Sequence, residues 1–74
     1  MALEAIVNRD GVFRVVLEEY PEGVYVLVFD TPEAKWPCRD NLQADWAMAK
    51  RSALRRWGIS DKMWKEISDT RFNG

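Results

Sequence analysis

The sequence predicts one small α+β domain, in which a three-stranded antiparallel β-meander is followed by a long helix packed on the sheet and a short C-terminal helix. Three observations predict it. The chain has 74 residues, its first half contains valine-rich and aromatic runs between glycine-containing turns, and its second half carries apolar residues at helical spacing. A chain of this length forms one hydrophobic core, so residues 1–74 are expected to be a single domain.

Residues 3–8 are predicted to form the first strand, joined to the next through Arg9-Asp10-Gly11. A two-residue Asp-Gly turn would point Glu4 at the core, whereas a three-residue turn would reverse every side chain. Burial of apolar surface favours the longer turn. The side chains that it places inward are Leu3, Ala5 and Val7. The alternative is a short helical turn over residues 2–7, because short apolar runs are ambiguous by period alone.

A β-hairpin is predicted from residues 12–20 and 24–30, which are rich in β-branched and aromatic residues. Pro21-Glu22-Gly23 lies between them and favours a three-residue turn with a bulge at the glycine. This turn places Val15 opposite Phe29. The side chains predicted to face the core together are Phe13, Val15, Leu17, Tyr25, Leu27 and Phe29.

The opposite face of the predicted sheet also carries many valines and is the predicted protein-binding surface. An antiparallel sheet with one solvated face usually alternates apolar and polar residues more strictly. The excess of valine indicates that the face is covered or binds a partner, although valine also suits exposed strand positions. The contact residues, through which the chain could also self-associate, are predicted to be Val16, Val26 and Val28.

A long helix is predicted over residues 41–57, after a proline-containing loop at residues 31–39. Asp40 or Asn41 is expected to cap its start, and Gly58 is expected to end it in a left-handed conformation. Its apolar stripe recurs at spacings of three and four residues, which predicts that it packs on the sheet. The residues of this stripe are Leu42, Trp46, Ala49, Ala53 and Trp57.

A shorter helix is predicted over residues 61–69, with Ser60 as its cap. It is too short to be stable alone, so it is expected to cover either the far end of the long helix or the second face of the sheet. Residues 70–74 are expected to form a frayed tail.

The residue types argue against an enzyme. The chain has no histidine, which removes the usual general acid and base at neutral pH and the commonest metal ligand. Cys38 has neither a histidine to pair with as a nucleophile nor a second cysteine for a zinc site. The glycines are scattered and form no phosphate-binding loop. We therefore expect a non-catalytic protein with no cofactor and no metal.

Charge provides the alternative function, nucleic-acid binding. The formal net charge is −1, which gives no overall attraction to nucleic acid. Arg51 and Arg55, however, project together from the face of the long helix opposite its apolar stripe, while Lys50 and Arg56 flank that stripe. Phosphate backbones favour such a basic ridge. The acidic first half and the absence of an aromatic stacking surface beside the arginines argue against this alternative.

A cytoplasmic location is expected. No apolar run approaches the roughly 20 residues that a membrane-spanning helix needs. The first residues, Met1-Ala2-Leu3-Glu4, lack the basic and apolar regions of a secretory signal. A single cysteine also suits a reducing compartment.

Two segments carry a family resemblance: residues 13–26, Phe-Arg-Val-Val-Leu-Glu-Glu-Tyr-Pro-Glu-Gly-Val-Tyr-Val, and residues 40–50, Asp-Asn-Leu-Gln-Ala-Asp-Trp-Ala-Met-Ala-Lys. Over residues 12–57 the chain resembles HicB-like antitoxin domains, which run a hairpin, a short third strand and a helix opened by Asp-x-Leu. The residues at comparable positions are Asp40, Leu42, Ala47 and Lys50. The chain departs from that pattern in its extra N-terminal apolar segment. The resemblance implies binding of a small protein partner, and the preferred function is a protein-interaction or regulatory module.

Overall fold

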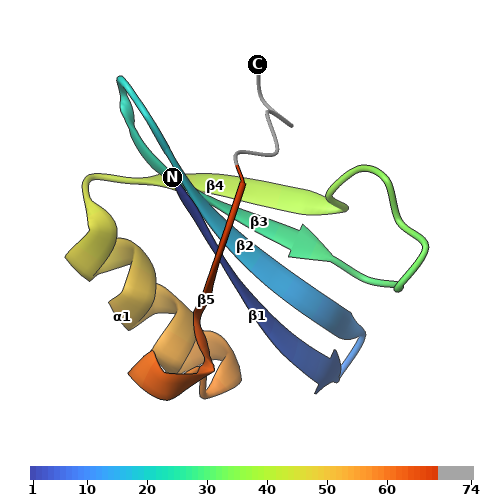
Figure 1. Cartoon of the computed structure of the whole chain (residues 1–74). Coiled ribbons are helices and arrows are strands. Elements are labelled where there is room, and N and C mark those ends of the chain that lie inside the picture. Colours follow the sequence, from blue (N-terminus) through green and yellow to red (C-terminus); the bar gives the residue numbers. More distant parts are fainter. Residues whose placement is uncertain (69–74) are drawn as a thin grey trace.

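The computed structural model describes residues 1–68, which form a five-stranded antiparallel sheet with one α-helix against one face (Figure 1). The elements are β1 (Ala2–Arg9), β2 (Val12–Tyr20), β3 (Gly23–Phe29), β4 (Arg39–Gln43), α1 (Trp46–Trp57), the 3-10 turn η1 (Asp61–Met63) and β5 (Lys65–Ile67). The strand order is β4-β3-β2-β1-β5. The α+β class is confirmed, but the predicted three-stranded meander with two helices is wrong. The predicted tail at residues 70–74 lies outside the described residues.

The turn between β1 and β2 has two residues, Asp10 and Gly11. Arg9 pairs with Val12 across it, and the φ angles of Asp10 and Gly11 are 55° and 76°. Positive φ at both central residues is what a type I′ hairpin turn requires. The predicted three-residue turn is therefore wrong.

A bulge in β1 nevertheless gives this strand the predicted orientation. The register of β1 against β2 shifts between Ile6 and Arg9, and Asn8 within that gap has a φ of 51°. The extra residue of a bulge shifts the register by one, so the side chains of the strand beyond it point to the opposite face of the sheet. The side chains on the helix side of the sheet are therefore Leu3, Ala5 and Val7. The alternative of a helical turn over residues 2–7 is wrong, because these residues belong to β1.

The turn between β2 and β3 is one residue shorter than predicted. As a result, each β3 side chain points to the face of the sheet opposite to the predicted one. Tyr20 pairs with Gly23, so the loop is Pro21-Glu22 instead of three residues. Val15 then pairs with Val28 and not with Phe29. A slip of one residue exchanges the two faces of a strand. The β3 side chains that face the helix are Val24, Val26 and Val28, whereas those on the opposite face are Tyr25, Leu27 and Phe29.

The helix starts later than predicted because the residues before it form an edge strand. Residues 39–43 pair with β3 as β4, so Leu42 belongs to the sheet and not to the helical stripe. Asp45 is the N-cap, and its side chain accepts a hydrogen bond from the Met48 backbone N–H at 2.9 Å. The predicted end is confirmed: Gly58 adopts a left-handed conformation, and its N–H donates to the Leu54 carbonyl.

The second predicted helix, over residues 61–69, is wrong for the part that the structure describes. Only η1 is helical there, and β5 follows it and pairs antiparallel with β1, with Ala2 opposite Ile67. The free edge of β1 offers backbone donors and acceptors along its length, and these need partners when they are covered.

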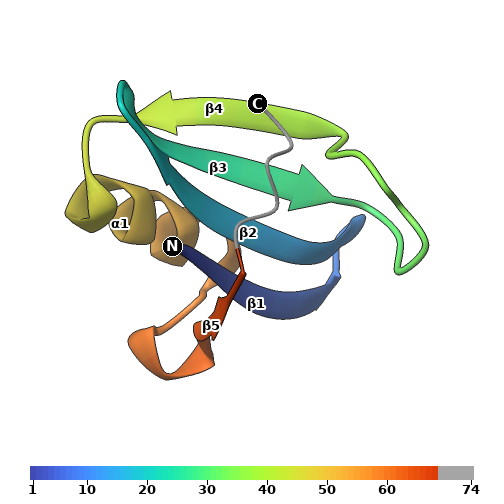
Figure 2. The same cartoon turned by 45° about the horizontal axis from the view of Figure 1, so that its top comes forward.

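Apolar side chains are buried on both faces of the twisted sheet, and α1 lies against one of them (Figure 2). We call the face that α1 covers the helix side and the opposite face the distal face. The buried residues of the helix side are Ala5, Val12, Val15, Leu17, Val24, Val26, Val28, Ala49, Ala53, Trp57 and Ile59. Those of the distal face are Ala2, Val16, Leu27 and Phe29. The alanines at the contact let the helix approach the valines of the sheet closely.

Two tyrosines and an acid meet near the tip of the β2–β3 hairpin. The Tyr25 hydroxyl donates to Glu22 Oε2 at 3.2 Å, and the rings of Tyr20 and Tyr25 meet edge to face with centroids 5.3 Å apart. Desolvation of the phenol, followed by the negative charge and the hydrogen bond of Glu22, raises the pKa of Tyr25 above its ordinary value of 10.0.

Replacing Gly23 by alanine should destabilise the fold by roughly 3 kcal/mol. Gly23 has a φ of 149°, and an added Cβ would lie 2.3 Å from the Gln43 carbonyl oxygen in β4. Gly11→Ala is the matched control, because Gly11 has a φ of 76° but open space around it, and it should lose only about 1 kcal/mol. Chemical denaturation measures both values. Equal losses would show that β4 does not approach Gly23 closely.

Replacing Glu22 by glutamine should lower the pKa of Tyr25, because it removes the negative charge that opposes ionisation of the phenol. The folded-state pKa of Tyr25 is raised, so its contribution to stability is complete below pH 10.0 and is lost as the pH rises through the folded-state pKa. The variant should therefore lose less stability in alkali. Tyrosinate absorbance and alkaline denaturation test this. Glu19→Gln, at an exposed position, is the control, and an equal shift in both variants would be the opposing result.

Candidate functional site

The three valines of the predicted protein-binding surface do not share a face. Val26 and Val28 lie in the helix-side core, whereas Val16 lies on the distal face. Their exposed fractions are 0% for Val16, 1% for Val26 and 3% for Val28. The reversal of β3 separates them, because it turns the even-numbered residues of this strand towards α1. The structure therefore does not bring these residues together on a surface.

The predicted nucleic-acid-binding arginines, in contrast, do lie together. Arg51 and Arg55 are exposed on α1 and line an open hollow of about 480 Å³ whose other wall includes Gln43 at the end of β4. We call this hollow the basic groove. Its remaining lining residues are Met48, Ser52 and Arg56. The helical residues among them recur at spacings of three and four, so they form one flank of α1.

Arg56 is the site residue that the sequence reasoning missed. It was expected to lie beside the apolar stripe and cover it, and its guanidinium carbon does lie 5.8 Å from the centroid of the Trp57 ring. The same side chain also lines the basic groove. Its four-residue spacing from Ser52 was the available signal, but the groove itself depends on β4, which the sequence reasoning did not predict.

The arginines of the sheet and those of the helix have different surroundings. Arg14 pairs with Glu4 at 2.7 Å and lies 4.1 Å from the centroid of Phe29, while Arg9 donates to the Trp57 carbonyl. These contacts join elements of the fold. Within residues 1–68, the side chains of Arg51 and Arg55 make no hydrogen bond and no salt bridge, and no carboxylate lines the basic groove. The groove is therefore a concentration of positive charge that the described fold does not neutralise.

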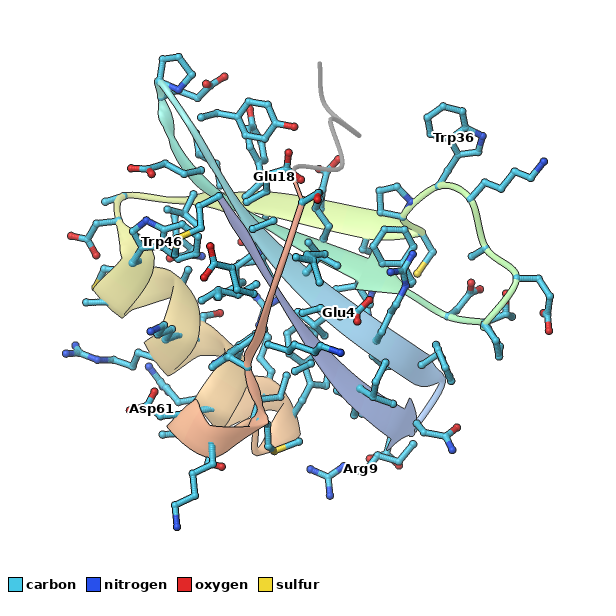
Figure 3. All side chains as sticks on the ribbon, in the orientation of Figure 1. Glu4, Arg9, Glu18, Trp36, Trp46 and Asp61 are labelled. Atoms are coloured by element: carbon cyan, nitrogen blue, oxygen red, sulfur yellow. The ribbon has the colours of Figure 1, made fainter. Side chains whose placement is uncertain are left out.

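A second, smaller hollow lies on the other flank of α1. It has a volume of about 280 Å³ and shares Arg51 with the basic groove. Its other lining residues are Lys50, Leu54, Ile59, Ser60 and Asp61. Asp61, beside the end of α1 (Figure 3), supplies a carboxylate on this flank. The charge of the two flanks therefore differs, and the flank towards β4 is the more basic one.

The strand β4 forms one wall of the basic groove and also one edge of the sheet. It pairs with β3 on one side, and no other strand of residues 1–68 pairs with its outer side. The outward backbone N–H and C=O groups of such a strand can pair with another chain. Gln43, whose side-chain amide donates to Asn41 Oδ1 at 2.9 Å, connects this edge to the groove. The open backbone groups of β4 and the guanidinium groups of the basic groove are therefore neighbours.

The other side chains that could bind a ligand lie apart from one another. Cys38 is exposed, and Trp36, which projects from the loop before β4 (Figure 3), is 71% exposed. Glu18 on the distal face is 2% exposed and accepts a hydrogen bond from the Tyr20 hydroxyl at 3.1 Å. No group of three or more metal-ligating side chains occurs among residues 1–68. Within that same range, no helix has the length and apolar character needed to cross a membrane.

Comparison with known proteins identifies no relative: no protein-family model, no curated protein and no solved structure matches the chain. The resemblance to HicB-like domains therefore stays a prediction. The structure places Asp40 and Leu42 in β4 and Ala47 and Lys50 in α1, so the Asp-x-Leu segment does not open the helix in this chain. The basic groove, with the edge of β4 beside it, is the candidate functional site.

Proposed function

We propose that this protein is a small non-catalytic protein-interaction module whose basic groove binds an acidic segment of another protein. The observation that carries the proposal is the convergence of Arg51, Arg55 and Arg56 on one hollow without a carboxylate in its lining. Guanidinium groups bind carboxylates through paired, charge-assisted hydrogen bonds. An acidic segment would supply the negative charges that the described fold does not place there.

The composition of the groove favours a protein over a nucleic acid. Met48 adds an apolar, adaptable surface to the arginines, and methionine and arginine are both enriched in protein interfaces. No aromatic ring lines the groove, whereas binding of single strands usually includes stacking of bases on such rings. Asp45, which caps the start of α1, and Asp61, near its end, place negative charge at both ends of the helix. A long polyanion that followed the helix would meet this repulsion.

The structure gives no support to self-association through the valine surface. Val16, Val26 and Val28 are buried and lie on two different faces, so an exposed apolar patch made of these residues does not exist in the described fold. The proposal therefore concerns a different partner, held by charge on the outside of α1.

The double variant Arg51→Gln/Arg55→Gln should bind an acidic peptide about tenfold more weakly than the unchanged protein, because it removes two charged hydrogen-bond donors at an exposed site. The probe is a fluorescein-labelled peptide of ten residues with alternating glutamate and threonine, titrated by anisotropy at low and moderate salt. Binding should weaken as salt rises, since salt screens exposed charges.

Lys62→Gln/Lys65→Gln is the matched control for this measurement. It removes the same amount of charge from exposed lysines outside the basic groove, so it should bind like the unchanged protein. Absence of peptide binding at low salt, or an equal loss in the control, would contradict the proposal. Tighter binding of a single-stranded or duplex oligonucleotide of the same length would favour the nucleic-acid alternative instead.

A further inference from the structure

We infer that the acidic segment binds as an added β-strand, which extends the sheet along the outer edge of β4 and points alternate acidic side chains at the basic groove. The inference rests on the proposed function and specifies the conformation and the sequence pattern of the partner. Two independent features carry it: the open edge of β4 and the arginines on the flank of α1 above that edge.

The basic groove lies where the sheet ends. The buried stripe of α1 packs on the sheet through Ala49, Ala53 and Trp57. On the flank away from η1, the last strand below the helix is β4, whose Gln43 forms the wall of the groove. A further strand would lie about 4.8 Å beyond β4. It would therefore occupy the open side of the groove and give the overhanging flank of α1 a surface to contact.

The pairing of β4 determines which side of the added strand faces the arginines. Arg39, Asn41 and Gln43 pair with β3 residues whose side chains face the helix. Paired residues in neighbouring strands project to the same face, so these β4 side chains also project to the helix side. In an added strand, every second side chain would lie beside them, below Arg51 and Arg55. The matching sequence has acidic residues at positions i and i+2, with the residues between them facing the distal side.

Two kinds of interaction would then act together. Backbone hydrogen bonds to β4 would hold the segment in register, as in other complexes formed by strand addition, and side chains at alternate positions would give specificity. The ion pairs with the arginines would select acidic segments and increase the association rate. Asp40 projects to the face away from the groove, because it pairs with Leu27 of the distal face. Its negative charge therefore lies away from the acidic side chains of the segment.

Four unlabelled peptides of equal length and charge test the inference by competition with the fluorescent probe. The first alternates glutamate and threonine. The second has the same sequence with N-methyl groups on alternate residues, which removes hydrogen-bond donors from one edge, and the third is methylated on the other residues instead. The fourth has its glutamates in one block. At least one of the methylated peptides should bind at least tenfold more weakly, and the block peptide should be weaker than the alternating one.

Amide hydrogen exchange in the protein provides the second readout. Alternate backbone N–H groups within Arg39–Gln43 should exchange more slowly when the alternating peptide is bound, because outward N–H groups become paired. If both methylated peptides bind as well as the parent and β4 exchange is unchanged, the inference is overturned. The proposed function survives that result if Arg51→Gln/Arg55→Gln still weakens binding about tenfold. If none of the peptides binds at low salt, both proposals fail.

Discussion

The register between β2 and β3 is the constraint on which the rest of the structure depends. The two-residue loop Pro21-Glu22 pairs Tyr20 with Gly23, and this single choice decides that the valines of β3 face α1. The backbone at Gly23 has a φ of 149°, which an L-residue rarely adopts. A turn one residue longer would place Tyr25, Leu27 and Phe29 beneath the helix, where larger rings would have to fit against alanines.

The bulge in β1 acts in the same way, because its extra residue shifts the register by one and exchanges the two faces of the strand. At Asn8 the extra residue compensates for a short turn, so β1 keeps its apolar side chains on the helix side. In the second hairpin no such compensation occurs, and β3 is reversed relative to the expectation. Sequence patterns located these strands well because valine and aromatic runs are clear. They could not determine which side chains of each strand lie against the helix, because both faces of β2 and β3 carry apolar residues.

Pairing between distant segments explains the other differences from the sequence prediction. The helical stripe through Ala49 and Ala53 and the end at Gly58 are local features, and they were predicted correctly. Residues 41–43 and 65–67 were predicted as helical because their local pattern is compatible with a helix, but they pair with β3 and with β1 instead. The arginines Arg51 and Arg55 were recognised as a pair. The groove that they line required β4, so it could not be predicted from spacing alone.

The contacts between β3 and α1 test this account most directly. In protein with selectively labelled methyl groups, nuclear Overhauser effects should connect the methyls of Val26 and Val28 with those of Ala49 and Ala53, because all four belong to one buried cluster. Such effects between the alanines and Leu27, with none to the two valines, would contradict the account. Leu27 and not the valines would then lie against the helix, and β4, which pairs with β3, would present different side chains to the groove.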